Sequence, residues 1–289
     1  MEGTGSASWL ASASLELFPV QEASAVFGMT ILIPLLRFLL EPCLFMPVAR
    51  LLLGKQSQGG IMSPRLAATA KKMCESQWKL LYYSVSTALG VWATYNQPWL
   101  FDTKQLWVGW PDQVLTTPMR VLYTTELAYY LSTIFLLALC EVPRKDYPVM
   151  MLHHFSTVAL IIFTYKYNYA RAACVVMLLH DINDVIMEIA KILNYSSYEV
   201  ASQFVFSCFL LSWLVLRICI FPAYIIYSCF FEVQDALGFR PPFHMLLNSL
   251  MALLYVIHIY WFALILKIAY MCVATGRGKD VREEDSHED

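Results

Sequence analysis

Charged residues are scarce in this 289-residue sequence. Asp, Glu, Lys and Arg make up 15% of the chain, against about 25% in an average soluble protein. Hydrophobic residues make up 58%, and the mean hydropathy is +0.54. This composition is typical of a polytopic membrane protein. The net charge is only −2, and the basic residues are spread over several loops, so no nucleic-acid partner is expected.

The sequence also lacks the cysteine and histidine patterns of common metal and disulfide proteins. Its eight cysteines include no CxxC pair, and most of them fall inside apolar runs. This excludes a zinc knuckle and a disulfide framework. Six histidines are too few for the multiple histidine boxes of the membrane di-iron hydroxylases and desaturases. No basic residue precedes the first apolar run, so we expect residues 1–23 to be a disordered leader that is not a cleaved signal peptide.

Seven apolar segments are long enough to cross a membrane as helices, which predicts an all-α polytopic membrane protein with about seven transmembrane helices. The first segment is broken by prolines, and we expect it to be a peripheral anchor. We expect the other six to form one membrane domain over residues 78–273. The predicted spans cover about 24–48, 78–96, 119–140, 147–167, 170–193, 200–231 and 243–272.

Lys and Arg are distributed unequally between the two sides of the predicted membrane. Residues 49–77 form a basic connector, and a second basic group precedes the fourth span. Cytosolic loops are enriched in Lys and Arg, so the pattern predicts a luminal N-terminus and a cytosolic acidic tail over residues 274–289.

The fourth and fifth segments carry ionisable residues that are costly in lipid. An acid at the centre of a spanning helix costs about 2.5–3.5 kcal/mol on insertion scales. At about 100° per residue, those of the fifth segment fall on one stripe, and the antiparallel fourth segment brings its histidines to a similar depth. We therefore interpret the two helices as the candidate functional site. Its ionisable residues are His153, His154, His180, Asp181, Asp184 and Glu188.

Imidazole can act as a nucleophile or base near neutral pH, and carboxylates can orient it or accept a proton. These residue types therefore favour acid–base or covalent catalysis. A single zinc ion held by His153 or His154, together with His180 and Asp184, is the alternative; our prediction is that no metal is needed. A seven-span receptor fits the topology, but receptors do not ordinarily have such a cluster in their cytosolic half.

Two other polar residues lie in predicted spans outside this pair of helices. A lone buried histidine such as His258 is more often an interhelical hydrogen-bonding residue than a ligand. Arg217 either pairs with a buried acid such as Glu126 or Asp184, or holds a substrate phosphate.

The motifs resemble those of the ceramide synthases of the longevity-assurance group, which carry the TLC domain. The likeness covers about residues 100–273, and no homeobox-like domain fits the connector. Ala172 stands where the family usually has Gly. The matching motifs are Arg144-Lys145-Asp146, His153-His154, Asn168 with Arg171, His180-Asp181-Ile182-Asn183-Asp184, and Lys191 to Tyr195.

The resemblance implies that residues 78–273 are the catalytic membrane domain, in which six helices form a TLC-type barrel around a lipid-wide cavity, in the endoplasmic reticulum membrane. It also implies N-acylation of a sphingoid base (sphinganine, phytosphingosine or sphingosine) by fatty acyl-CoA, with no cofactor. The acyl group would pass through an acyl-imidazole at His153, with His154, His180, Asp181 and Asp184 as further catalytic residues. We expect substrate contacts from Glu126, Tyr165, Glu188, Arg217, His258 and Trp261.

Two further expectations follow from the resemblance. The partners would be acyl-CoA, the sphingoid base and membrane lipids, with a second synthase chain or a small accessory membrane subunit as protein partners. The determinant of acyl-chain length would lie in the luminal connection over about 232–243. The alternative is a non-catalytic TLC-domain protein that binds or traffics lipid; such proteins usually lack the complete histidine and aspartate set.

Overall fold

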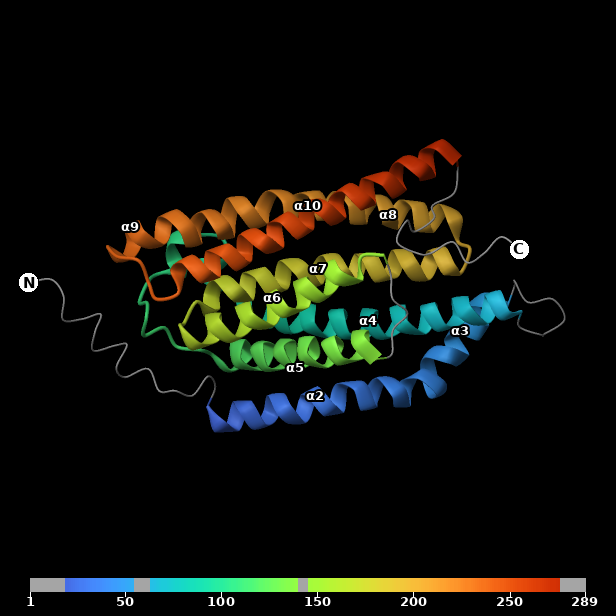
Figure 1. Cartoon of the computed structure of the whole chain (residues 1–289), viewed down its shortest axis with the longest axis horizontal. Coiled ribbons are helices and arrows are strands. Elements are labelled where there is room, and N and C mark those ends of the chain that lie inside the picture. The colour runs from blue at the N-terminus through green and yellow to red at the C-terminus, as the bar shows by residue number, and fades with distance from the viewer. Residues whose placement is uncertain (1–18, 55–62, 140–144, 276–289) are drawn as a thin grey trace, which may run out of the picture.

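The computed structural model describes residues 19–54, 63–139 and 145–275, and every regular element in them is helical (Figure 1). Two of the seven long segments are composite helices. The first composite segment is α2 (Val20–Leu40), which continues through η1 (Glu41–Phe45) and α3 (Met46–Leu53). The second is α8 (Glu199–Trp213), which continues through η5 (Leu214–Ile226), η6 (Ser228–Glu232) and α9 (Val233–Leu237). The other five segments are single helices: α4 (Pro64–Thr94), α5 (Thr117–Leu139), α6 (Tyr147–Lys166), α7 (Ala170–Tyr195) and α10 (His244–Thr275). Two short 3₁₀ turns, η3 (Pro98–Leu100) and η4 (Thr103–Leu106), follow α4.

Five of these segments are long and apolar enough to cross a membrane: Val20–Leu53, Thr117–Leu139, Tyr147–Lys166, Glu199–Leu237 and His244–Ala274. The prediction of an all-α polytopic membrane protein is confirmed. Helices α4 and α7 are not among the five, because their lengths include several charged residues. They pack extensively against each other in the bundle. An added Cβ at Gly90 of α4 would lie 3.1 Å from Leu178 Cδ1 of α7, so this glycine permits the close approach.

The bounds of the first two segments differ from the sequence prediction. Helix α2 begins at Val20, and helical structure continues to Leu53. Helix α4 begins at Pro64, where the Ser63 hydroxyl accepts a hydrogen bond from the Leu66 amide. Much of the predicted connector 49–77 is therefore helical. Residues 1–18 and 276–289, which hold most of the predicted leader and nearly all of the tail, lie outside the described residues.

Helix α2 lies on the outside of the bundle against α5 (Figure 1). Large apolar side chains such as Phe27 and Leu32 are exposed on it, as expected for a surface that faces lipid. At its first turn, Glu22 is paired with Arg120 of α5, with Arg120 Nη1 3.0 Å from Glu22 Oε1, and accepts a hydrogen bond from Tyr165 of α6. The polar contacts thus attach α2 at one end of the bundle.

The segment after α8 is wound into wide π-helical turns over Leu214–Ile226. Pro222 lies inside it, and proline cannot donate the backbone hydrogen bond of a regular α-helix. Such turns often occur at functional sites. This one carries Arg217 into the centre of the bundle, where its side chain is 3% exposed.

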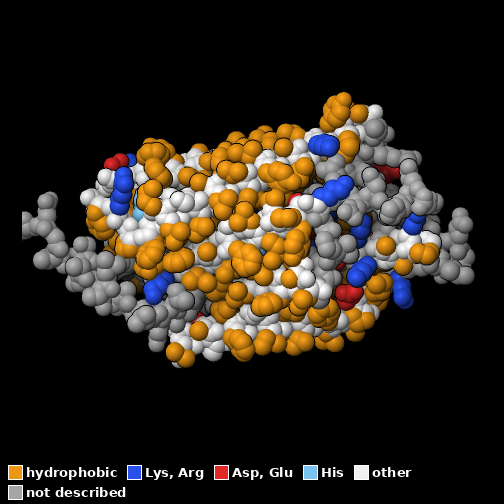
Figure 2. All heavy atoms as spheres, viewed as in Figure 1, with side chains coloured by type: hydrophobic (Ala, Val, Ile, Leu, Met, Phe, Trp, Pro, Cys, Tyr) orange, Lys and Arg blue, Asp and Glu red, His pale blue; other side chains and the backbone are white. Residues whose placement is uncertain are grey.

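The described surface has a broad apolar middle and charged side chains towards its two ends (Figure 2). The start of α2 and the end of α10 lie at opposite ends of the bundle (Figure 1). Helix α7 ends near the end at which α10 finishes, whereas α6 ends and α7 begins near the start of α2 (Figure 1). This distribution is the one expected of a protein that crosses a bilayer with charges at both interfaces.

Candidate active site

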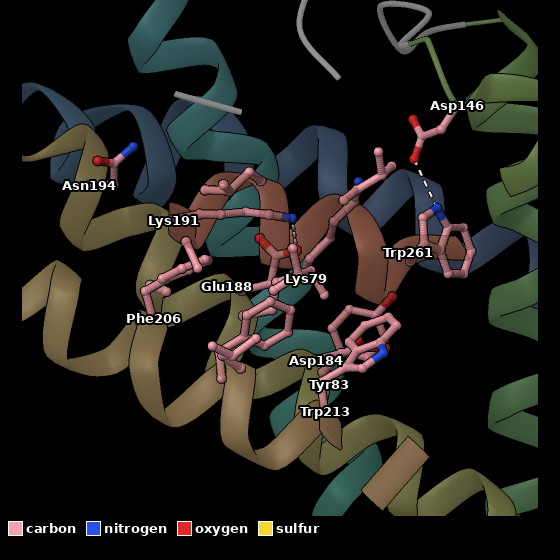
Figure 3. A pocket seen from close by; sticks show the side chains of 18 of the residues that line it. Lys79, Tyr83, Asp146, Asp184, Glu188, Lys191, Asn194, Phe206, Trp213 and Trp261 are labelled. Carbon is pink, nitrogen blue, oxygen red and sulfur yellow. Dashed lines mark hydrogen bonds and ion pairs between the residues drawn. The ribbon is translucent and has the colours of Figure 1, made fainter. Parts of the chain in front are cut away.

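The bundle contains a cavity of about 890 Å³, which we call the outer chamber. The described residues that line it come from α4, α5, α6, α7, the α8–η5 segment and α10, with a few from the adjoining loops. It reaches from the middle of the bundle to the ends of α7 and α10, at Asn194 and Val273. Figure 3 shows Lys79, Glu188 and Lys191 grouped on one wall, with Trp261 opposite them. The outer chamber is therefore a large space with both charged and apolar walls.

A second, smaller cavity of about 60 Å³ lies deeper in the bundle, and we call it the inner chamber. Its walls are mostly apolar and include Leu160 of α6, Ala172 of α7 and Met251 of α10. Two residues, His153 and Tyr130, line both chambers. These two residues therefore lie at the junction of the chambers.

The adjacent histidines on α6 have related but different surroundings. His153 is only 7% exposed, and its ring packs edge-on against Trp261 with centroids 5.2 Å apart. Its Nδ1 atom has no hydrogen-bond partner among the described residues. His154 packs against Tyr130, with centroids 5.4 Å apart, and lines the outer chamber only. Both imidazoles therefore reach the outer chamber.

The hydrogen bonds of His180 on α7 fix its tautomer. His180 Nδ1 lies 2.6 Å from the Val176 carbonyl oxygen, and His180 Nε2 lies 3.0 Å from His258 Nε2. A carbonyl only accepts, so His180 Nδ1 carries the proton. In the neutral ring Nε2 must then accept, and His258 Nε2 is the donor. Both ring nitrogens of His180 are occupied, which favours a positioning role over the catalytic role expected from the sequence.

Asp184 forms an ion pair with Arg217, one of the two alternatives that the sequence left open. Arg217 Nη2 lies 2.6 Å from Asp184 Oδ1 and donates to the His180 carbonyl oxygen at 3.0 Å. The guanidinium carbon lies 4.2 Å from the centroid of the Trp213 ring, within the range of a cation–π contact. Buried charges need such partners, because desolvation in the bundle is costly.

Two more predicted site residues line the outer chamber. Glu188 is fully buried and pairs with Lys191, with Lys191 Nζ 2.8 Å from Glu188 Oε1. Trp261 Nε1 donates to Asp146 Oδ2 at 3.1 Å (Figure 3). Asp146 belongs to the motif before the histidine pair, so this bond connects the start of α6 to α10.

Asp181 lies on the other side of the junction from Asp184. Its Oδ2 is 2.7 Å from Ser86 Oγ of α4, and the same hydroxyl contacts Glu126 Oε1 of α5. Tyr82 of α4 donates to Glu126 Oε1 at 3.0 Å. Asp181 and Glu126 are each 1% exposed and line the inner chamber. The structure thus brings these two acids together between three helices.

Tyr165 is the one predicted site residue that the structure places away from the others. It lies on α6 twelve residues after His153, which corresponds to about 18 Å along a helix, and its hydroxyl contacts Glu22 of α2. Its ring packs on Tyr123. Tyr165 therefore contributes to the attachment of α2.

Sequence reasoning missed the contribution of α4. Ser86 and Tyr82 bind the buried acids, and Lys79 and Tyr83 line the outer chamber. Their spacing was a usable signal, because residues 79, 82, 83 and 86 fall on one face of a helix. Across the described residues, no group of three or more His, Cys, Asp or Glu is arranged to hold a metal ion.

The model of the TLC domain (TRAM, LAG1, CLN8) matches residues 72–267, which span all six segments that line the outer chamber. The chain is 36% identical over 276 residues to ceramide synthase 1 LOH3 of Arabidopsis thaliana, covering 89% of each chain. It is 34% identical over 293 residues to an ASC1-like protein of Solanum lycopersicum, covering 95% of this chain and 96% of the relative. It is 34% identical over 227 residues to ceramide synthase 4 of Mus musculus, covering 76% of this chain and 57% of that protein. Both the domain match and the identity over most of the chain therefore show that it belongs to the TLC-domain family, in the group that includes the ceramide synthases.

Proposed function

We propose that this protein is a ceramide synthase that transfers a fatty acyl group from acyl-CoA to the amine of a sphingoid base. The observation that carries the proposal is the place of His153. Its buried imidazole lies at the junction of a large chamber with charged and apolar walls and a small apolar one, with Nδ1 free of hydrogen bonds among the described residues. A nucleophile at such a junction meets the reactive carbonyl while the alkyl chain lies in apolar surroundings. The names of the relatives support the same reaction class.

In the first half-reaction, an imidazole nitrogen of His153 attacks the thioester carbonyl. A nitrogen–carbon bond forms, the carbon–sulfur bond breaks, and the imidazole proton passes to the departing thiolate. The product is an acyl-imidazole and free CoA. Trp261, packed on the His153 ring and held by its bond to Asp146, keeps the ring orientation fixed during the attack.

In the second half-reaction, the amine of the sphingoid base attacks the acyl-imidazole. The amide bond forms, the bond to the ring nitrogen breaks, and one amine proton returns to the imidazole. A sphingoid base arrives as an ammonium, so one further proton must leave it before the attack. The overall products are the amide, CoA and one proton.

The outer chamber suits the polar part of acyl-CoA. Lys79 and Lys191 lie on its wall, and ammonium groups bind phosphates such as those of CoA as point charges. We propose that CoA occupies this end of the chamber at the cytosolic surface and that the acyl chain enters the bundle through the inner chamber, which in this structure is too small to hold the whole chain. The membrane would be that of the endoplasmic reticulum, with the start of α2 luminal and the end of α10 cytosolic. A second synthase chain or a small membrane subunit would be the protein partner.

The test is purified protein with acyl-CoA alone, followed by addition of sphinganine. We expect one equivalent of CoA to be released first, with an adduct of one acyl group by intact-mass analysis, and N-acyl product after sphinganine is added. CoA release only when both substrates are present would replace the acyl-imidazole by direct attack. No product from any acyl chain would favour the alternative, a lipid-binding protein without turnover.

A further inference from the structure

Two buried acids on different helices contact the same hydroxyl group. Ser86 Oγ of α4 lies 2.7 Å from Asp181 Oδ2 and also contacts Glu126 Oε1. Ser86 is fully buried, and the two acids are each 1% exposed. No ion pair within the described residues involves either acid.

The hydrogen-bond count of this group requires a proton on one of the acids. The hydroxyl of Ser86 has one hydrogen, so it can donate to only one carboxyl oxygen. If the Ser86 hydroxyl donates to one acid, its oxygen can only accept from the other, so that other acid carries a hydrogen. Two ionised carboxylates held by one hydroxyl, buried and with no ion-pair partner among the described residues, would also repel strongly. One proton shared by the two acids therefore satisfies both contacts of Ser86.

The acid pair faces the same inner chamber as His153. Glu126, Asp181 and His153 all line this chamber. His153 Nδ1 is the polar atom there that has no hydrogen-bond partner among the described residues. Its residue is only 7% exposed. An unsatisfied buried nitrogen indicates a place for a ligand atom. The acids are therefore positioned where a polar group bound to His153 would lie.

We propose that Glu126 and Asp181 share one proton, and that this singly charged pair accepts the proton which the ammonium of the sphingoid base must lose. The proposal rests on the proposed function. The pair starts with one proton and a charge of −1, which attracts the ammonium. It takes one proton and becomes neutral, and the free amine then attacks the acyl-imidazole. After the product leaves, the pair releases that proton and regains its charge.

Infrared spectroscopy of the purified protein tests the shared proton without any substrate. We expect one C=O stretching band of a buried protonated carboxylic acid, shifted on exchange into D2O. The band should vanish in Glu126→Gln and in Asp181→Asn, because the remaining acid is then the charged carboxylate. It should persist in Glu22→Gln, a matched change of an acid far from the chambers. A wild-type spectrum without such a band would overturn the proposal.

The half-reactions test the catalytic role. Each single amide variant keeps one carboxylate and a charge of −1, so we expect acyl transfer to sphinganine to slow by less than about tenfold. The double variant Glu126→Gln/Asp181→Asn has no acceptor, and transfer should fall by at least about a hundredfold, the usual contribution of a general base. Formation of the acyl adduct without sphinganine should continue in all three variants, and Glu22→Gln should perform both steps normally.

The outcomes separate this inference from the proposed function. An adduct in the double variant that sphinganine does not discharge supports the acid pair. An adduct that the double variant discharges at the wild-type rate overturns it, as does a single variant as slow as the double one. Absence of an adduct in the wild-type protein contradicts the acyl-imidazole instead, and the infrared band then still decides whether the proton is shared.

Discussion

The outer and inner chambers differ in how their acids are neutralised. In the outer chamber, Asp184 pairs with Arg217 and Glu188 pairs with Lys191. In the inner chamber, Asp181 forms no ion pair within the described part of the chain and contacts a second acid through Ser86. All three acids of α7 lie on one stripe within two helical turns. A single helix face thus supplies fixed ion pairs to one chamber and a proton-holding acid to the other, and His153 lies between them.

Replacing the histidine at the junction should have the largest effect. We expect His153→Ala to abolish both the acyl adduct and CoA release, because no other imidazole of the described residues lines both chambers. His154→Ala removes a neighbour that lines only the outer chamber, so a slower reaction with a detectable adduct is expected. Intact-mass analysis after incubation with acyl-CoA measures both. An adduct that persisted in His153→Ala and disappeared in His154→Ala would assign the nucleophile to the other histidine.

Breaking the buried ion pair of the outer chamber should mainly affect stability. Arg217→Met leaves Asp184 as a buried charge without its partner, which typically costs about 3–5 kcal/mol. The double variant Arg217→Met/Asp184→Leu removes both charges and should recover most of this loss. Thermal unfolding in detergent measures the effect.

A matched pair at the surface provides the control for that experiment. Arg120 is paired with Glu22, and its side chain is 49% exposed. Exposed ion pairs contribute about 0–1 kcal/mol to stability, so Arg120→Met should change the unfolding temperature little. Equal losses in Arg217→Met and Arg120→Met would contradict the contrast between buried and exposed pairs.

The lysines of the outer chamber should affect substrate affinity. If Lys79 and Lys191 contact the phosphates of CoA, Lys79→Gln should raise KM for acyl-CoA by about tenfold or less and leave KM for sphinganine unchanged. Lys191→Gln should raise the KM for acyl-CoA to a similar extent, and it also removes the ion-pair partner of Glu188. Raising the salt concentration should weaken acyl-CoA binding in the wild type more than in the variants. Equal salt dependence in all three proteins would place CoA elsewhere.

Much of the fold could be predicted from hydropathy, because apolar runs determine where helices cross a membrane. The fourth and fifth segments begin at Tyr147 and Ala170 as predicted. The first turns of α4 could not be predicted as part of a span, because Lys71, Lys72 and Glu75 interrupt the apolar pattern there. Helix α4 continues because its buried residues, such as Met73 and Cys74, pack on α3.

The ionisable part of the site could also be predicted, because helical spacing puts the charges of α7 on one stripe. What could not be predicted were contacts between distant segments. The bond between His180 and His258 joins residues 78 positions apart, and it changes His180 from a candidate catalyst to a residue with both nitrogens occupied. Ser86 was missed because a serine in an apolar helix is common; only its position between two acids makes it informative.

The smallest effect is expected in the inner chamber, where substitutions should change product length and leave total turnover nearly unchanged. Ala172→Leu adds bulk to the wall of the chamber, which should favour shorter acyl chains, and Met251→Ala should favour longer ones. A methylene in an apolar pocket is worth about 1–3 kcal/mol, so each change should alter the ratio of long to short products several-fold. Product analysis by mass spectrometry from mixed acyl-CoA substrates measures the ratio.

The comparison for this prediction is the connection over residues 232–243, our sequence-based candidate for the length determinant. To test the connection, we would replace it with the corresponding loop of a relative that prefers another chain length. The variants Ala172→Leu and Met251→Ala test whether the helices that line the inner chamber set the product length instead. Val233 is fully buried and belongs to the same hydrophobic cluster as Cys229, Leu247 and Met251, which line the inner chamber. The connection and the chamber wall are thus parts of one packed core and can act together. A product profile that moves with the loop and not with Ala172→Leu or Met251→Ala would place the determinant in the connection, because only groups that touch the end of the acyl chain can discriminate its last carbons.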